Sequence, residues 1–318
     1  MCYSAQVLSQ YEKYVRLWGA DISVRHFYHV YFLRDRTVGV KIPKAIDAWF
    51  ANPRNDDERQ IKALIDTFNA SQASKLEQEL FKQRKRLADA ERTLQTRTTK
   101  KAIEDQRIAT NKVDQILQRL GDLKRAEPKD RDARIFPMVY APVIIMKDGK
   151  RTIVPMRYQC RPAGKPAFYD VKFPGTYNAR RDNLEGFWKP QFGSDHAIML
   201  VTAFYENVSL HTMEHRALAE GEKEQNVILE FRPRPEETMV VACLWSRWGS
   251  GDDELLSFAA ITDEPPAEVA AAGHDRCIIQ IRPDNADAWL QPQAGDLARQ
   301  YALLDDRQLP FYEHRKAA

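Results

Sequence analysis

The chain has 318 residues, of which 43% are hydrophobic and 29% charged, and its formal net charge is +3. This composition is typical of a soluble globular protein and excludes an intrinsically disordered one, while the small net charge alone indicates no class of partner. No apolar run approaches the roughly 18 residues of a transmembrane helix. The N-terminus has no basic segment followed by an apolar block, so we expect neither a membrane span nor a secretory signal.

The four cysteines, Cys2, Cys160, Cys243 and Cys277, are far apart and form no Cys-x-x-Cys pair. We therefore expect no disulfide framework, no metal site and no cofactor, and we expect the reducing cytoplasm as the location.

The N-terminal third changes character at about residue 56. Residues 1–55 combine a helical pattern from Gln6 to Trp18 with an aromatic stretch at 26–33, whereas neither glycine nor proline occurs between Asn55 and Leu120. Leucines then recur at spacings of four and seven residues, which places them on one helical face (Leu76, Leu80, Leu87 and Leu94). The segment 56–130 is predicted to form a long helix, or an antiparallel helical hairpin that breaks near residues 96–101.

The charge of this helical segment leaves its role open. Residues 77–134 contain 16 lysines and arginines against 11 acidic residues. This balance is typical of a solvated coiled-coil arm, and an arm that contacts nucleic acid or a protein partner is the alternative.

Residues 131–318 contain short apolar runs of strand character, separated by turns. The runs lie at 141–146, 152–156, 196–205, 226–231, 238–245, 255–262 and 277–281. Because few helical patterns separate them, we predict an α+β fold with a mixed, curved, barrel-like sheet. The chain 1–318 is predicted to be one domain, with 56–130 inserted as a helical arm. No Gly-x-Gly-x-x-Gly, P-loop or Gly-x-Ser-x-Gly motif supports a nucleotide-binding or α/β-hydrolase fold.

Cys2 is the first candidate for chemistry. A side chain as small as cysteine at position 2 permits removal of Met1, which exposes an α-amine and a thiol on one residue. The amine, with a pKa of about 8, condenses with an aldehyde to a Schiff base, and the thiol then closes a thiazolidine ring. The alternative is that a cysteine at position 2 is incidental.

Three polar positions beside predicted strands are further candidates. Asn178 follows a Pro-Gly turn, and its amide could orient a ligand or stabilise an oxyanion. Glu206 ends an apolar strand, where a carboxylate can do acid–base work, although such a residue is more often a salt-bridge partner. His274 precedes a strand and can transfer protons near pH 7, although a structural turn residue is the commoner role.

Residues 150–190 are locally basic, with nine lysines and arginines against three acidic residues. Seven aromatic residues lie among them. Cations that track phosphates and rings on which bases stack are what a single-strand groove requires. A basic surface over buried aromatic residues has the same composition.

Taken together, these segments resemble the SOS response-associated peptidase family. The family pattern begins with Met-Cys and continues with an Asn-Ala-Arg segment, an aromatic-Tyr/Phe-Glu strand end and a His-Asp-Arg before an apolar strand. Here these are Met1-Cys2, Asn178-Ala179-Arg180, Phe204-Tyr205-Glu206 and His274-Asp275-Arg276. The chain departs from the family where Tyr3, Ser4 and Ala5 replace the Gly-Arg-Phe that commonly follows Met-Cys.

The resemblance implies a DNA-damage protein that removes its own Met1 and links Cys2 covalently to the aldehyde of an abasic site in single-stranded DNA. It implies that Asn178 holds the N-terminal residue and the opened sugar, that Glu206 transfers protons, and that His274 assists Schiff-base formation. The arginines expected to contact DNA are Arg180, Arg181, Arg276, Arg157 and Arg161. The implied source is bacterial or phage-encoded.

Two alternatives remain from the sequence. One is a cysteine peptidase that acts on other proteins through Cys2. The other is a noncovalent protein that binds a partner through the 56–130 arm.

Overall fold

The computed structural model describes residues 3–37 and 39–317. The chain divides into two compact units. The first, which we call the barrel unit, is formed by Met1–Trp49 and Lys129–Ala318; the second, which we call the helical arm, is Phe50–Pro128.

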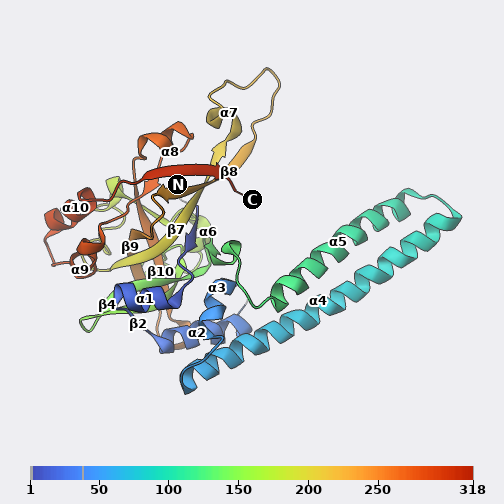
Figure 1. Ribbon diagram of the computed structural model, residues 1–318, viewed down its shortest axis with the longest axis horizontal. Coiled ribbons are helices and arrows are strands. Elements are labelled where there is room, and N and C mark those ends of the chain that lie inside the picture. Colours follow the sequence, from blue (N-terminus) through green and yellow to red (C-terminus); the bar gives the residue numbers. More distant parts are fainter. Residues whose placement is uncertain (1–2, 38, 318) are drawn as a thin grey trace. The chain divides into compact units, whose positions relative to one another are not determined.

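The barrel unit combines one mixed sheet with short helices (Figure 1). Its strands are β1 (Ser4–Val7), β2 (Asp21–Ile22), β3 (Arg134–Ile135), β4 (Tyr140–Lys147), β5 (Lys150–Tyr158), β6 (Asn178–Arg180), β7 (His196–Ser209), β8 (Asn226–Arg234), β9 (Met239–Trp248), β10 (Leu255–Asp263), β11 (Cys277–Ile278) and β12 (Phe311–Lys316). Its helices are α1 (Tyr11–Trp18), α2 (Val24–Arg36), α3 (Lys44–Asp47), α6 (Tyr169–Lys172), α7 (Leu210–Met213), α8 (Ala267–Ala271), α9 (Ala286–Leu290) and α10 (Leu297–Asp305).

Five of the strands close on themselves. β10 pairs with β5, β5 with β4, β4 with β7, β7 with β9, and β9 again with β10. The β5–β10 pair is parallel and the other four pairs are antiparallel. The predicted α+β fold with a mixed, barrel-like sheet is therefore confirmed.

The core of the barrel unit is built from aliphatic and aromatic side chains of these five strands. Fully buried members are Val143, Val154, Ile198, Val241 and Phe258, one from each strand. Consecutive residues of β7 are buried on both faces of the sheet, because α9 packs against β7 from outside. This is why the strand reads as a continuous apolar run instead of an alternating one.

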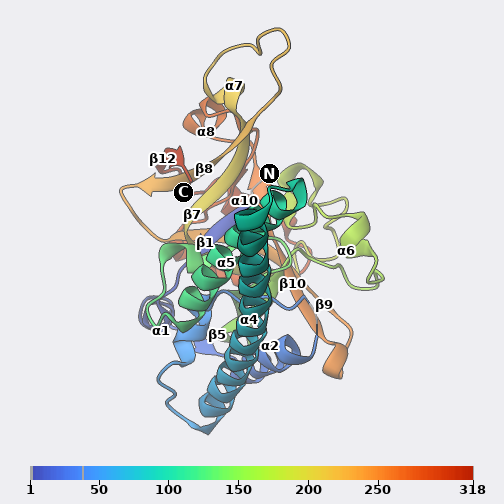
Figure 2. The ribbon, with the colours of Figure 1, turned by 90° about the vertical axis from the view of Figure 1, so that its right-hand side faces the viewer.

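β7 changes partners along its length. Residues His196–Val201 pair with β9 inside the barrel, and residues Phe204–Ser209 pair with β8. β1 lies on its other edge, and Figure 2 shows β7 and β8 running side by side to the segment that contains α7. The second half of β7 therefore lies between β1 and β8.

The helical arm is an antiparallel hairpin of α4 (Asp56–Thr96) and α5 (Lys100–Lys124) (Figure 1). Buried positions recur every seven residues, at Gln83 and Ala90 on α4 and at Ala102, Ala109 and Ile116 on α5. This spacing is the heptad period of a coiled coil. The predicted hairpin and its break near residues 96–101 are confirmed.

The predicted helical pattern from Gln6 to Trp18 is wrong at its start. Ser4–Val7 form β1, which pairs with β3 and β7, and the helix begins only at Tyr11. Hydrogen bonding to two strands far away in the sequence outweighs the local helical pattern here.

Among the described residues, no helix combines the length and the apolarity that crossing a bilayer requires.

Candidate functional site

Glu206 is a fully buried carboxyl group near the end of β7. It lies opposite Leu229 of β8, and the residue before it, Tyr205, lies opposite Ser4 of β1. Burial removes the carboxyl group from water, and burying a charge without a compensating contact is costly. The position therefore requires a polar neighbour.

His274 supplies that neighbour. It lies between α8 and β11, and its Nε2 is 3.1 Å from Oε2 of Glu206. Its Nδ1 lies 2.8 Å from the carbonyl oxygen of Arg276, a contact that a proton on Nδ1 makes a hydrogen bond, and 3.3 Å from the Arg276 backbone nitrogen. Burial lowers the pKa of His274, while the Arg276 carbonyl opposes that shift.

The pair of Glu206 and His274 is able to move a proton. Because Nδ1 contacts the Arg276 carbonyl, Nε2 faces the Glu206 carboxyl group, 3.1 Å from Oε2. Such a buried imidazole–carboxyl pair can accept a proton from one reacting group and return it to another. The sequence prediction that placed both residues in the site is consistent with this contact.

A cavity of about 370 Å³ opens beside the pair. Its lining comes from β1, β3, β7, β8 and the segments before β1, β6 and β11: Tyr3, Ser4, Arg134, Tyr177, Tyr205, Glu206, Asn207, Ile228 and His274. Cys2 lies outside the described residues. Tyr3, the residue that follows Cys2 in the sequence, lines the cavity.

Arg134 is a cation of this cavity that sequence analysis did not identify. Its guanidinium donates to the Ser4 hydroxyl at 2.9 Å and lies 3.7 Å from the centroid of the Tyr205 ring. The pairing of β3 with β1 brings it there from far along the sequence. No motif around residue 134 predicts this position, because the contact exists only once the two strands pair.

Tyr3 has aromatic neighbours in the cavity wall. Its ring packs edge-on against Phe136 and Tyr177, with centroids 5.9 Å and 6.0 Å apart. Tyr3 remains 47% exposed, so the aromatic surface is open to a ligand.

Asn178 follows Tyr177 and begins β6, which pairs in parallel with β10 at Ala260. The residue is 5% exposed, and neither atom of its side-chain amide has a hydrogen-bond partner among the described residues. An unsatisfied buried polar group costs about 1 to 3 kcal/mol. The amide is therefore a candidate for holding a ligand group.

Arg180 and Arg276, two of the expected DNA contacts, lie close together. The Asp182 carboxylate accepts from Arg180 at 2.6 Å and is 3.6 Å from Arg276. The Arg180 side chain is 49% exposed, and an exposed ion pair of this kind contributes little to stability. Exchanging the carboxylate for a phosphate is thus energetically cheap.

Arg181 points elsewhere. It pairs with Asp305 at 2.5 Å and with Asp263 at 3.7 Å. Neither carboxylate is the Asp182 group that Arg180 and Arg276 share, so Arg181 does not belong to that cluster.

The structure corrects the interpretation of Arg157 and Arg161. Both are buried, and both donate to Asp170 at the start of α6. Burial alone raises the pKa of Asp170, but hydrogen bonds from Arg161 and Arg157 bring it below its usual value. These two guanidiniums hold the 159–172 segment in place and do not face solvent where a phosphate would bind.

The described cysteines are poor nucleophiles. Cys160, Cys243 and Cys277 are buried and free, and burial raises the pKa of the Cys160 thiol to about 12. Burial also raises the pKa of Cys243 and Cys277. Within residues 3–37 and 39–317, no group of three or more His, Cys, Asp and Glu side chains is arranged to hold a metal ion.

Comparison with known proteins identifies the family. A family model described as SOS response associated peptidase (SRAP) matches residues 97–315. The match begins at Arg97, so it includes α5 and the segments with Asn178, Glu206 and His274, but not Cys2. No curated protein matches the chain.

Three solved structures are similar to this chain over 58% of its length. One is a protein from Bordetella bronchiseptica, with 16% identity, 87% of its own chain covered and a TM-score of 0.46. A second is a protein from Bacteroides thetaiotaomicron, with 15% identity, 78% covered and a TM-score of 0.45. A third is a phage-related protein from Bordetella bronchiseptica, with 20% identity, 81% covered and a TM-score of 0.44.

Because the family model matches more than half of its residues, the chain belongs to the SOS response associated peptidase family, which is named for the response to DNA damage and for peptidase activity.

Proposed function

We propose that this protein removes its own Met1 and then links Cys2 covalently to an abasic site in single-stranded DNA. The observation that carries the proposal is the buried contact of 3.1 Å between Glu206 and His274, beside a cavity whose wall includes Tyr3, the neighbour of Cys2. A reaction in the cytoplasm of a bacterium, on bacterial or phage DNA, fits this chemistry and the family.

The first step is hydrolysis of the peptide bond between Met1 and Cys2. Water adds across the bond, which releases methionine and leaves Cys2 with a free α-amine and a thiol. Glu206 takes the proton from the attacking water and delivers it to the leaving amine. A buried carboxyl group in contact with an imidazole suits this task, because both partners can exchange protons without bulk water.

The second step joins the protein to the opened sugar. The amine of Cys2 attacks the C1 aldehyde to form a carbinolamine, which loses water to give a Schiff base. The Cys2 sulfur then attacks the imine carbon, and the thiol proton passes to the nitrogen as the five-membered thiazolidine ring closes. One water leaves overall. His274 is neutral near pH 7, since burial lowers its pKa, and it can accept the amine proton.

The remaining residues bind and orient the DNA. The Asn178 amide, which lacks a partner among the described residues, would hold the opened sugar or the N-terminal residue. Arg180 and Arg276 would exchange Asp182 for a phosphate of the backbone. Tyr3 and Tyr177 offer rings against which a base can pack.

A denaturing gel tests the covalent step. The purified protein is mixed with a single-stranded oligonucleotide that carries one abasic site, and intact-mass spectrometry records whether Met1 is present. We expect a band that resists denaturation, and no such band with an oligonucleotide whose abasic site is a tetrahydrofuran analogue without an aldehyde.

Two variants of Cys2 separate the chemical steps. Cys2→Ser keeps the amine but not the thiol, so we expect a covalent species only when borohydride traps the Schiff base. Cys2→Ala should behave in the same way if Met1 is removed. A wild-type protein that lacks Met1 and still gives no band would contradict the proposal, and cleavage of added peptides by that protein would favour the peptidase alternative.

A further inference from the structure

Positive charge is concentrated at one end of the helical arm. Residues 82–101, which comprise the end of α4, the connection and the start of α5, contain eight lysines and arginines and two acidic residues. The rest of the arm, residues 50–81 and 102–128, contains nine basic and eleven acidic residues. The overall count of basic and acidic residues therefore does not show that this end of the arm is strongly basic. We call residues 82–101 the arm tip.

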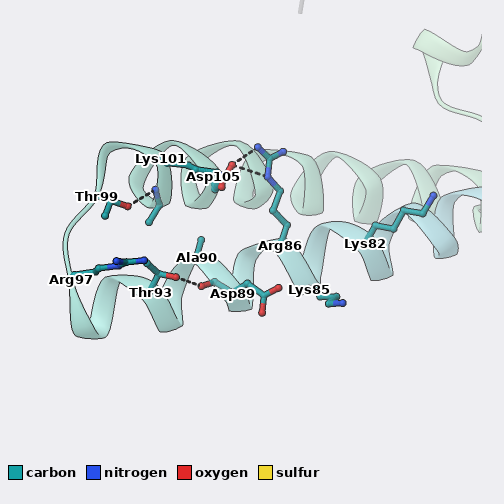
Figure 3. A pocket seen from close by; sticks show the side chains of 11 residues that line it. Lys82, Lys85, Arg86, Asp89, Ala90, Thr93, Arg97, Thr99, Lys101 and Asp105 are labelled. Carbon is teal, nitrogen blue, oxygen red and sulfur yellow. Dashed lines mark hydrogen bonds and ion pairs between the residues drawn. The ribbon is translucent and has the colours of Figure 1, made fainter.

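The arm tip contains a cavity of about 510 Å³ between the two helices. Five of its lining residues are cationic and two are acidic: Lys82, Lys85, Arg86, Arg97 and Lys101, and Asp89 and Asp105. Figure 3 shows Arg86 reaching from α4 to Asp105 on α5, and Arg97 extending into the space between the helices near the connection. The cations thus come from both helices and converge on one volume.

Most of these cations lack an acidic partner. Arg86 pairs with Asp105 at 2.5 Å and Arg92 with Asp89 at 3.2 Å. The other six basic residues of the tip make no ion pair with any described residue: Lys82, Arg84, Lys85, Arg97, Lys100 and Lys101. Like charges held this close repel one another, and a bound polyanion relieves the repulsion.

The cavity offers little to a protein partner. Its only apolar lining residues are the small Ala90 and Ala102, whereas protein interfaces depend on large aromatic or aliphatic anchors. The N-terminus of α5 is already capped, because the Thr99 hydroxyl accepts from the Ala102 amide. Recognition at this place would therefore depend on charged side chains, which is how proteins hold a phosphate backbone.

We propose that the arm tip binds the phosphodiester backbone of DNA without forming a covalent bond. This second contact is separate from the Cys2 site and would hold the protein on DNA irrespective of a lesion. The chemistry is shared by single-stranded and duplex DNA, so both are used as probes.

The test compares two triple variants of the full chain. Lys82→Gln/Lys85→Gln/Lys101→Gln removes three cavity cations, and Lys75→Gln/Lys112→Gln/Arg119→Gln removes three exposed cations of the same arm outside the cavity. Fluorescence anisotropy measures binding of labelled single-stranded and duplex oligonucleotides without an abasic site, over a series of salt concentrations. Because these probes contain no aldehyde, the result is independent of the covalent chemistry.

We expect the cavity variant to bind at least about tenfold more weakly than the wild type at low salt. The slope of log K against log salt should fall by about 2 for single strands, because each lost phosphate contact removes roughly 0.7. The control variant should retain most of the affinity and most of the salt dependence of the wild type. The probe that loses more affinity in the cavity variant identifies the form of DNA that is bound.

Two results would overturn the proposal. One is an equal effect of both variants, which would indicate general attraction by net charge. The other is an unchanged affinity of the cavity variant for DNA. Polyglutamate serves as a further anisotropy probe, and if the cavity variant loses affinity for polyglutamate but not for DNA, the partner is an acidic protein. Far-UV circular dichroism confirms that both variants keep the helical arm.

Discussion

At the scale of single residues, the contact between Glu206 and His274 decides which chemistry the cavity can support. The Glu206 carboxyl group has no exposed surface, and the His274 imidazole, 3.1 Å away, is a proton carrier in direct reach of it. The Nδ1 contact with the Arg276 carbonyl fixes the ring so that Nε2 faces Glu206. Each residue of the pair is therefore required to position the other.

We predict that Glu206→Gln retains Met1 and slows crosslinking by about 100-fold or more, because an amide has the shape of the carboxyl group but cannot transfer its proton. Intact-mass spectrometry and the rate of band formation on a denaturing gel measure the two effects. Glu230→Gln is the matched control, since Glu230 is also a buried strand residue but pairs with Arg232 and Arg315 outside this cavity. Normal Met1 removal in Glu206→Gln would be incompatible with the proposed role.

A second buried histidine has a structural role. His196 lies between backbone groups, since its Nε2 accepts from the Gly193 amide and its Nδ1 donates to the Trp289 carbonyl. Burial lowers the pKa of His196 to about 4, whereas an unfolded chain binds a proton near 6.5. The buried, neutral His196 therefore contributes its full stabilisation of the folded state above pH 6.5. This contribution is lost as the pH falls from 6.5 towards 4, because the unfolded state binds the proton at a higher pH than the folded state does.

The expected loss from His196 is about 3 kcal/mol of unfolding free energy between pH 6.5 and pH 4. Urea unfolding at several pH values measures it. The variant His196→Asn keeps a donor for the Trp289 carbonyl but does not titrate, so its stability should depend less on pH over this range. Identical pH profiles of variant and wild type would show that His196 does not contribute.

At the scale of elements, Asp170 connects the segment around α6 to the end of β5. It accepts from Arg157 at 2.8 Å, and it also accepts from Arg161, whose guanidinium lies 4.6 Å from the centroid of the Trp248 ring. Two buried guanidiniums share one carboxylate here, so removing its charge leaves both without compensation.

We predict that Asp170→Asn lowers the unfolding free energy by about 3 to 5 kcal/mol, as expected for breaking a buried ion pair from one side. Asp306→Asn is the control, because its ion pair with Arg282 is exposed on both sides and contributes little to stability. Chemical denaturation of both variants measures the difference. Equal effects would mean that the buried cluster is no more important than a surface pair.

The two helices of the arm approach each other through small residues. Ala90, Ala102 and Ala109 are buried; Ala90 lies seven residues after Gln83 on α4, and Ala109 lies seven residues after Ala102 on α5. Ala109 has no exposed surface and, unlike the other two, does not line the arm-tip cavity, so a larger or charged side chain there has no room.

Ala109→Asp should destabilise the arm by about 2 to 4 kcal/mol, because it buries an uncompensated charge. Hydrogen exchange read by mass spectrometry should show lost protection in α4 and α5 and unchanged protection in the barrel strands. Ala88→Asp, on the exposed face of α4, is the matched control and should exchange like the wild type. Unchanged protection in Ala109→Asp would contradict the hairpin packing.

At the scale of the whole molecule, the barrel unit and the helical arm are two compact units with different sources of stability. The barrel unit has a core of fully buried side chains from five closed strands, whereas most residues of the arm are exposed or half-buried. Separate unfolding is expected when units share little of their stability.

We predict that heating unfolds the arm before the barrel unit. All six tryptophans lie outside residues 50–128, so their fluorescence reports on the barrel unit alone, while far-UV circular dichroism is dominated by α4 and α5. The circular dichroism midpoint should therefore be the lower of the two, and Ala109→Asp should lower it further without moving the fluorescence midpoint. Coincident midpoints that shift together would indicate one cooperative unit.

The sequence by itself determined the parts of this protein that local pattern controls. The absence of glycine and proline, together with the leucine spacing, predicted the hairpin and its break, and apolar runs predicted the strands β4, β5 and β7–β10. The motif resemblance selected Glu206 and His274, which the structure places in contact.

Only the tertiary structure decided what depends on pairing between distant segments. β1 and β12 become strands because they add to β7 and β8, and Arg134 enters the cavity because β3 pairs with β1. Burial turned Arg157 and Arg161 from expected phosphate contacts into partners of Asp170. A basic residue has the same identity in the sequence whether it faces solvent or a buried carboxylate, and only the fold distinguishes the two.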